Sequence, residues 1–556
     1  MKNSCYNILY MRKFKFKSVV ALAQMKLSVK SAAIVLASST LMSALLGLFR
    51  DRLLNSYYLG TYPTGIDAYT AAFTIPDFMF FILTSGALSV SFIPVFNQRL
   101  AAGNKKSAWE LSSSTLNLLA ILTLISSVLI MIFADPLIRY VVSPGLDESG
   151  MILAINMTRV IAINPFLFSI ATVITSIQQA VGRFVFYAFA PAIYNIGIII
   201  GITWFTGGIN IFGVQIFEGG IMGVALGVIL GAVLQLIVSL IGLFGLGMDY
   251  HFKIHWKNQG FRSILKLLPA RSMDQGIDYV NGIVNTNLSS RMGAGAVRSF
   301  NQASALHQMP VNLIGVAIST AFFPKLTEEL GNGDKKEFNE TFRQALRTIT
   351  WIALPVSVIA FFGRGYVTSF ISNIGNNDSN GTIASILGTL CVAIFARSIF
   401  HIASRGFYAY QDTKTPFIVS IFAIGLTIGL SIWFYLIGLG VDGLGWAQSI
   451  GAVVEIIILL YILQRRSGRV LLNRSYWRAT FRMFFATAIA GCVAFSMTKF
   501  VPLMVTDTSL VITIPKFLLI SSVSFIAYLI ASYFLNLKEA GPIFRYFKKI
   551  LFRNVK

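Results

Sequence analysis

Charge is scarce in this chain. Asp, Glu, Lys and Arg make up 12% of its 556 residues, against about 25% in soluble domains. Apolar runs recur instead, for example at 118–134, 187–205 and 516–534, and a run of ~18 residues is long enough to cross a hydrocarbon core of ~30 Å. The shortage of charge therefore excludes a large soluble domain and predicts an all-α protein that crosses a membrane many times.

Cysteine and histidine are also rare, with three and four copies. The three cysteines have no paired spacing, and His251 and His255 have no acidic partner nearby in the sequence, so neither a disulfide framework nor a metal site is expected. The chain contains no Walker loop and no HExxH or GxSxG sequence. We therefore expect a transporter, not an enzyme. It would have no cofactor and would be driven by Na⁺ or H⁺ coupling, the membrane potential or substrate removal.

The apolar runs predict about fourteen spans. We divide the chain into a basic cytoplasmic tail, an N-terminal lobe of six spans, a C-terminal lobe of six spans, two extra spans and a second basic tail, at 1–29, 30–247, 262–465, 479–535 and 536–556. The start codon is open, because Met11 and Met25 are alternatives to Met1.

The net charge of +23 does not indicate nucleic-acid binding, because the basic residues lie at span ends and not in one patch. Alternate loops collect Lys and Arg, as the positive-inside rule requires of cytoplasmic loops. The loops between them hold almost no cations but do hold acidic residues. This alternation predicts that both termini are cytoplasmic.

Two pairs of similar stretches indicate an internal repeat. GALSVSFIPVF (86–96) resembles GVAISTAFFPKL (315–326), and FAPAIYNIGIIIG (189–201) resembles KTPFIVSIFAIG (414–425). Both pairs are six spans apart, which predicts two parallel repeats with a substrate site between them, as in many transporters.

Polar residues inside spans are costly unless they face a cavity or a partner, so they are the candidate site. Arg50 and Arg52 end the first span, and Asp67 and Asp77 lie ten residues apart in the second, on either side of the helix-breaking Pro76. We expect these four charged side chains to line a cavity wall. The alternative for the arginines is anchoring at the lipid headgroups.

The seventh span is unusually polar. Arg271, Asp274 and Asp278 recur at helical spacing and share one face. Asp274 or Asp278 is a candidate site for Na⁺ or H⁺ coupling; the alternative is an ion-pair ladder with a structural role only.

Two further groups lie in the C-terminal half. Arg298 and His307 are polar residues of the eighth span, and His307 is either a proton carrier or a structural histidine. Arg405, Asp412 and Lys414 belong to RGFYAYQDTKTP (405–416), which we interpret as a gating elbow between two spans, with Thr413 or Asp412 capping the second.

The stretches FRD (49–51), DAYTAAFTIPDF (67–78), GALSVSFIPVF, FAPAIYNIG (189–197) and GFYAYQDTKTP (406–416) resemble the MurJ (MviN) family of lipid II flippases. The resemblance covers nearly the whole chain. It implies the multidrug/oligosaccharidyl-lipid/polysaccharide exporter fold, with two six-helix lobes in a V, alternating access, a cationic cavity and a groove for the lipid tail on the last two spans. It also implies a location in the bacterial cytoplasmic (inner) membrane.

The substrate implied by the resemblance is lipid II, the undecaprenyl-pyrophosphate-MurNAc-pentapeptide-GlcNAc precursor of peptidoglycan, with cell-wall synthesis proteins as further contacts. Arg50 falls on a cavity arginine of the family and Asp67 on its acidic position. The chain departs from the family pattern at four other charged positions, which are here Ala44, Phe80, Ser85 and Ala305. Arg52, Arg271 or Arg298 would then supply the missing positive charge.

Three other functions stay open at this point. A flippase for another polyprenyl-linked glycan, such as O-antigen or capsule units, would use the same fold. An ion-coupled multidrug exporter fits less well, because its cavity would be anionic or aromatic. A scaffold for envelope proteins would not need Arg50 or Asp67.

Overall fold

The computed structural model describes residues 21–22, 24–25, 29–85, 92–211, 214–372, 377–468, 471–504, 506–507 and 509–541. Most of the predicted tails, 1–29 and 536–556, lies outside these residues. The chain forms two compact units, Met1–Ala294 and Gly295–Lys556. The sequence-based division at 247–262 stays a prediction, while the seventh span belongs by its contacts to the first unit.

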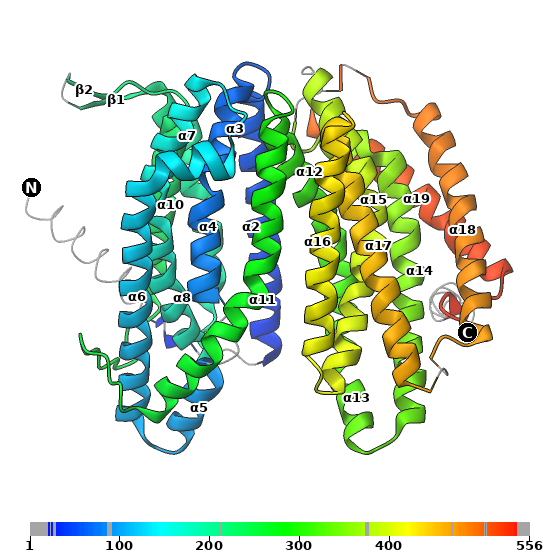
Figure 1. The fold of residues 1–556 in the computed structure, drawn as a ribbon, viewed down its shortest axis with the longest axis horizontal. Helices are drawn as coiled ribbons and strands as arrows, with labels where there is room; N and C mark the ends of the chain where they lie inside the picture. Colours follow the sequence, from blue (N-terminus) through cyan, green and yellow to red (C-terminus); the bar gives the residue numbers. More distant parts are fainter. Residues whose placement is uncertain are drawn as a thin grey trace, which may run out of the picture. The chain divides into compact units, whose positions relative to one another are not determined.

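The first unit is almost entirely helical within the described residues (Figure 1). Its elements are α2 (Val29–Tyr58), α3 (Pro63–Ala72), α4 (Thr74–Phe80), the π-helix η1 (Phe81–Ser85), α5 (Ile93–Ala101), α6 (Lys105–Pro136), the π-helix η3 (Leu137–Val142), α7 (Glu148–Ile161), α8 (Asn164–Ala180), α9 (Val185–Thr203), the 3-10 turn η4 (Phe205–Gly207), the hairpin strands β1 (Ile209–Ile211) and β2 (Val214–Phe217), α10 (Met222–Ile241) and α11 (Gln259–Ser290).

The second unit contains the remaining helices. They are α12 (Ala296–Val311), the π-helix η5 (Asn312–Val316), α13 (Ala317–Gly331), α14 (Lys335–Thr368), α15 (Asn377–Ala409), α16 (Lys414–Leu436), α17 (Gly440–Arg466), α18 (Arg474–Phe500) and α19 (Leu510–Phe534).

Thirteen helical segments of the described chain are long and apolar enough to cross a membrane. The all-α polytopic fold is therefore confirmed. The predicted span that is missing from these thirteen is the seventh, which corresponds to α11, a continuous helix of 32 residues. It is long enough to cross but is not among the thirteen, in keeping with its polar sequence.

The second predicted span, 65–98, is not one continuous helix. It is divided into α3, α4, η1 and α5, and the first break falls at Phe73. Pro76 has no N–H to donate to the carbonyl of Ala72, the last residue of α3, which explains the position of this break. The eighth span is continuous, with the π-helix η5 between α12 and α13. A π-helical segment thus precedes or overlaps both members of one repeated pair.

Glycines allow α9 and α10 to pack with their backbones in contact. A Cβ added to Gly197 would lie 2.2 Å from Cα of Gly231, and one on Gly201 would lie 2.6 Å from Cα of Gly227. These glycines recur every four residues on both helices, the spacing of small-residue interfaces between membrane helices. The seam positions α9, which carries part of the candidate site.

The last two helices, α18 and α19, both pack on α14 of the second unit. Tyr528 donates to the carbonyl of Trp351 at 2.7 Å, and Trp351 Nε1 donates to Ser532 Oγ at 3.2 Å. Just beyond α19, Glu539 forms an ion pair with Arg347, whose Nη2 donates to Oε2 at 3.1 Å. A lipid-tail groove on these helices stays a prediction.

Candidate functional site

Arg50 lies at the centre of a polar cluster inside the first unit. Nη1 donates to Oδ1 of Asn195 on α9 at 3.0 Å. Nε and Nη2 donate to Oδ1 of Asp51 at 3.2 and 2.9 Å. The Asn195 amide donates in turn to the carbonyls of Ser43 and Pro191, each at 3.3 Å. The Arg50 side chain is 24% exposed, so it is fixed between two helices and does not extend freely toward headgroups.

Of the two acidic residues of the second span, Asp77 lies close to this cluster. Asp67 is fully buried on α3, and Asp77 is half-buried on α4. Tyr194, on α9 beside Asn195, interacts electrostatically with both Arg50 and Asp77. Arg50 and Asp77 therefore share Tyr194 as a neighbour. That the four charged residues line one cavity wall stays a prediction.

A run of aromatic contacts connects the cluster to α11. Tyr279 stacks on Phe81 with centroids 4.6 Å apart, and Phe81 lies beside Phe80 at 5.3 Å. Phe80 contacts Phe168 at 5.7 Å, and Phe168 contacts Tyr194 at 5.2 Å. The sequence does not predict this run, because its members come from five elements and show no common spacing. Phe80, at a position where the family has arginine, is part of it.

The remaining candidates of the first unit are less defined. Arg52 is half-buried and has an interaction partner. Asp278 is an exposed residue of α11 that interacts electrostatically with Tyr279. Arg271, Asp274 and Asp278 all lie on the continuous helix α11. The side chains of Arg271 and Asp274 lie outside the described residues. Coupling at Asp274 or Asp278 stays a prediction.

The second unit contains a buried ion pair that joins three helices. Glu455 on α17, 2% exposed, accepts from Arg397 Nη1 on α15 at 3.1 Å. Its other oxygen accepts from Ser420 on α16 at 2.7 Å. Arg397 and Ser420 thus satisfy both oxygens of the carboxylate. Glu455 had not been selected from the sequence, where it is a single acid within an apolar run.

Arg298 and His307 are both buried on α12. With the Gln302 amide turned so that its oxygen faces the guanidinium, that oxygen accepts from Arg298 Nη2 at 2.7 Å. His307 lies close enough to Arg397 to interact with it electrostatically. Roles for Arg298 in substrate binding and for His307 in proton transfer stay predictions.

The predicted elbow is a real joint, but its members divide into two groups. Asp412 caps α16, accepting from the N–H groups of Lys414 and Thr415 at 3.1 and 3.0 Å, so of the two predicted caps Asp412 is the one used. Arg405 instead donates to Thr320 on α13 at 3.1 Å and lies 4.9 Å from the ring centroid of Phe323.

Of the four positions that depart from the family pattern, Ala44 and Ala305 are exposed residues of α2 and α12. Ser85 has a side chain outside the described residues. Which arginine replaces the missing charges stays a prediction.

Residues 55–515 match the family model for the lipid II flippase MurJ. The chain belongs to the lipid II flippase MurJ family. It is therefore a transporter and a multi-pass membrane protein. Asp67, Asp77 and Asn195 fall within the matched residues, while Arg50 lies five residues before them.

Individual relatives agree with this membership. The chain is 27% identical over 460 residues to a probable lipid II flippase MurJ of Buchnera aphidicola, covering 82% of this chain and 88% of that protein. It is also 27% identical over 444 residues to the lipid II flippase MurJ of Burkholderia cenocepacia, covering 78% and 84%.

Solved structures show the same fold. An inward closed lipid II flippase MurJ matches with a TM-score of 0.70 at 22% identity, covering 94% of this chain and 99% of that one. An inward-facing multidrug resistance transporter of the MATE family in the MOP superfamily matches with a TM-score of 0.63 at 21% identity, covering 79% and 98%. At these identities both comparisons establish the fold alone.

Proposed function

We propose that this chain translocates lipid II from the cytoplasmic to the outer leaflet of the bacterial cytoplasmic membrane by alternating access, for peptidoglycan synthesis. The observation that carries the proposal is the match of residues 55–515 to the MurJ family. The charge alternation of the loops supports an orientation with both termini in the cytoplasm.

The Arg50 cluster supports a role in binding the pyrophosphate. A guanidinium has five N–H donors in a rigid fork that matches phosphate oxygens. In Arg50, Asp51 and Asn195 accept three hydrogen bonds, so donors remain for a ligand. The pairing with Asp51 lowers the cost of placing a charge inside the membrane while the site is empty. On this proposal, pyrophosphate would compete with Asp51 for the guanidinium.

The energy source and the partners are part of the same proposal. A Na⁺ or H⁺ gradient or the membrane potential would drive the cycle, and Asp274 and Asp278 are the candidate coupling residues. Cell-wall synthesis proteins would take up the translocated product. Each of these statements can fail without affecting the assignment to the family.

The decisive experiment is complementation of a bacterial strain whose own lipid II flippase can be switched off. We expect this chain to restore growth and outer-leaflet lipid II, and the Arg50→Ala variant, present in the membrane at an equal level, not to restore them. If the chain is inserted correctly and lipid II still accumulates in the inner leaflet, the proposed substrate is wrong. Restoration of a capsule or O-antigen flippase mutant in the same assay would then indicate another polyprenyl-linked glycan.

A further inference from the structure

The loop between α10 and α11 is held against the start of α6 by polar side chains. Ser113 Oγ accepts from the N–H of His251 at 3.1 Å, and Ser114 Oγ accepts from the N–H of His255 at 2.8 Å. Asn117 donates to the carbonyls of His251 and Lys253 at 2.9 and 3.1 Å. The run of polar residues in α6, ELSSSTLN, thus fixes the backbone of a loop that has no regular structure of its own.

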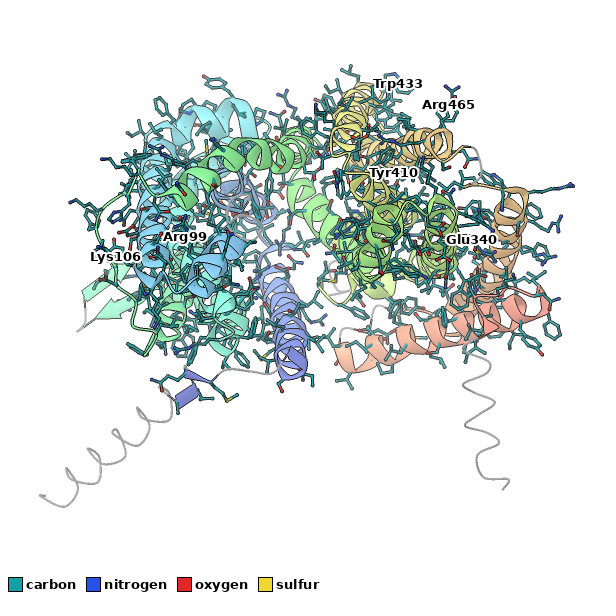
Figure 2. All side chains as sticks on the ribbon, turned by 90° about the horizontal axis from the view of Figure 1, so that it is seen from below. Arg99, Lys106, Glu340, Tyr410, Trp433 and Arg465 are labelled. Carbon is teal, nitrogen blue, oxygen red and sulfur yellow. The ribbon has the colours of Figure 1, made fainter. Side chains whose placement is uncertain are left out.

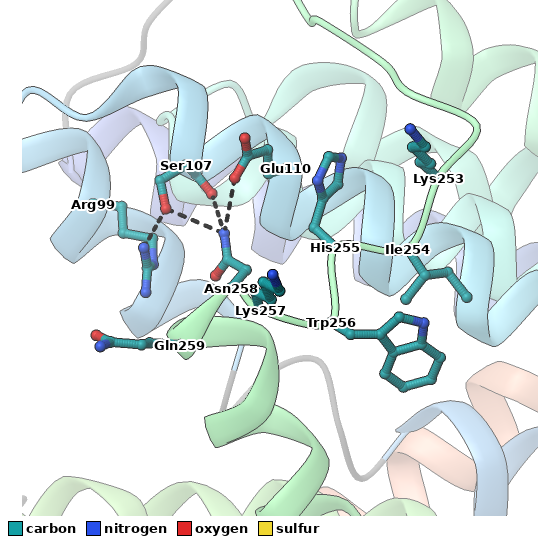
Figure 3. Close-up of a pocket in the computed structure, with 10 residues that line it drawn as sticks. All are labelled: Arg99, Ser107, Glu110, Lys253, Ile254, His255, Trp256, Lys257, Asn258 and Gln259. Carbon is teal, nitrogen blue, oxygen red and sulfur yellow. Dashed lines mark hydrogen bonds between the residues drawn. The ribbon is translucent and has the colours of Figure 1, made fainter.

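Between this loop and the ends of α5 and α6 lies a surface pocket of about 730 Å³ (Figure 3). Arg99, Lys253 and Lys257 supply three positive charges to its lining, against the single carboxylate of Glu110. Seen from below, Arg99 and Lys106 lie at the same end of the first unit (Figure 2). None of the pocket's lining residues belongs to the Arg50 cluster, so this is a separate site.

Two buried atoms of the pocket residues have no hydrogen-bond partner. They are Nε of Arg99 and Nε2 of His255. Arg99 does engage Ser107 through Nη1, and Asn258 fixes the neighbouring loop by donating to the carbonyl of Ser107 at 3.1 Å. Leaving a buried polar atom unpaired destabilises a protein. The guanidinium of Arg99 is fixed by Ser107 at the pocket lining, where its positive charge can attract an anion.

The surroundings of the pocket match the interfacial zone of a membrane. Trp256 in its wall is 55% exposed, and Tyr250 and Phe252 in the same loop are 45% and 86% exposed. Tryptophan and tyrosine collect at the headgroup level of membrane proteins. On α6, Ile121 is 44% exposed. It lies eleven residues after Glu110, roughly 16 Å along the helix and on nearly the same face.

We propose that this pocket binds the phosphate of an anionic phospholipid headgroup, with the acyl chains running along the apolar face of α6. Basic pockets beside membrane helices are suited to such headgroups, because the lysines and arginine pair with the phosphate while the tails stay in the hydrocarbon. The rigid loop sets the cations in place before the lipid binds. The site is independent of the translocated substrate, so it stands or falls separately from the proposed function.

The test is a lipid titration of the purified full-length protein followed by native mass spectrometry. The probes are phosphatidylglycerol and cardiolipin, compared with zwitterionic phosphatidylcholine. We expect the anionic lipids to be retained. We also expect the double variant Lys253→Gln/Lys257→Gln to bind them roughly 30-fold more weakly, as removal of two lysines beside an anionic headgroup predicts. Both lysines are exposed, so the variant is expected to fold, which its melting temperature will verify.

The matched control is Lys335→Gln/Lys336→Gln, two exposed lysines at the start of α14 outside the pocket. It should bind like the wild type. Equal retention of phosphatidylcholine, or unchanged binding by the pocket variant, would overturn the proposal. Binding of inorganic phosphate alone, without any preference for the lipid, would assign the pocket to a free anion and reject the lipid. The proposal would also be rejected if the pocket variant lost binding of lipid II but kept binding of phosphatidylglycerol.

Discussion

The carboxylate of Asp412 joins the ends of two helices. Its Oδ2 accepts from Nη1 of Arg466, at the end of α17, at 2.6 Å, while its Oδ1 caps the first turn of α16. Partial burial alone would raise the pKa of Asp412. The hydrogen bonds from Thr415 and Arg466 outweigh this effect and lower the pKa to about 2. The elbow between α15 and α16 is therefore also joined to the end of α17 by the Asp412–Arg466 ion pair.

Asp412→Asn should remove this ion pair and lower the stability of the protein in a pH-dependent way. Because the folded-state pKa lies below the ordinary value of 3.8, the stabilisation is present above about pH 4 and is lost as pH falls through about 2. We expect the wild type to be more stable than the variant by about 1–2 kcal/mol at neutral pH, with the difference closing toward pH 2. Thermal unfolding of the purified protein across this range measures it. The control is Asp334→Asn, which removes the charge of the residue that caps α14 and that forms no ion pair among the described residues. A gap that persists unchanged at pH 2 would contradict the assignment.

Arg50 and Asn195 should differ in what their loss removes. Arg50→Ala deletes the guanidinium and is expected to reduce lipid II translocation in proteoliposomes by about 100-fold, the value of a charge-assisted hydrogen bond or two. Asn195→Ala leaves the charge but removes the group that fixes Nη1, so we expect a smaller loss of about tenfold. Arg139→Gln, a surface arginine of the same unit paired with Glu148, should translocate normally. Wild-type rates in Arg50→Ala would remove this residue from the site.

The seam between α9 and α10 should tolerate no side chain. Gly227→Ala would place a Cβ 2.5 Å from Cα of Gly201, so the helices must separate. We expect a clear fall in melting temperature, on the order of 1–3 kcal/mol in stability. The control is Gly429→Ala in α16, where an added Cβ meets nothing within 4 Å and the change should be neutral or stabilising. A Gly227→Ala variant as stable as Gly429→Ala would show that the helices are not in close contact.

Much of this architecture could be predicted from single residues acting locally. Long apolar runs give spans because the bilayer requires helices of a certain length, and Pro76 predicted the break in the second span because a missing N–H acts within one turn. The sequence offers two candidates for the N-terminal cap of α16, Thr413 and Asp412, and in the structure Asp412 makes the capping hydrogen bonds.

Features that depend on contacts between distant segments were not predicted. The role of Asn195 requires α2 and α9 to be neighbours. The role of Glu455 depends on Ser420 and Arg397, which lie 35 and 58 positions away in the sequence. Gly223, Gly227 and Gly231 recur every four residues in the sequence, and this spacing alone could have indicated the close helix contact. No sequence rule would have joined Tyr279 to Tyr194 through three phenylalanines, because stacking partners carry no complementary charge or spacing.

The Arg397–Glu455 pair offers a test of whether such a buried contact is structural. Glu455→Gln keeps the volume but leaves the Arg397 guanidinium without its buried counter-charge, and breaking a buried pair costs about 3 kcal/mol. Arg397→Gln should cost a similar amount, since it leaves a carboxylate that is 2% exposed. In Arg397→Gln/Glu455→Gln two neutral amides face each other, so the double variant should be destabilised by less than the sum of the single changes. Thermal unfolding of the four proteins measures the coupling. If the costs of the two single changes are strictly additive, the two side chains do not depend on each other. If the costs are strongly coupled and the double variant still translocates its substrate, the pair serves the stability of α15, α16 and α17 and not transport.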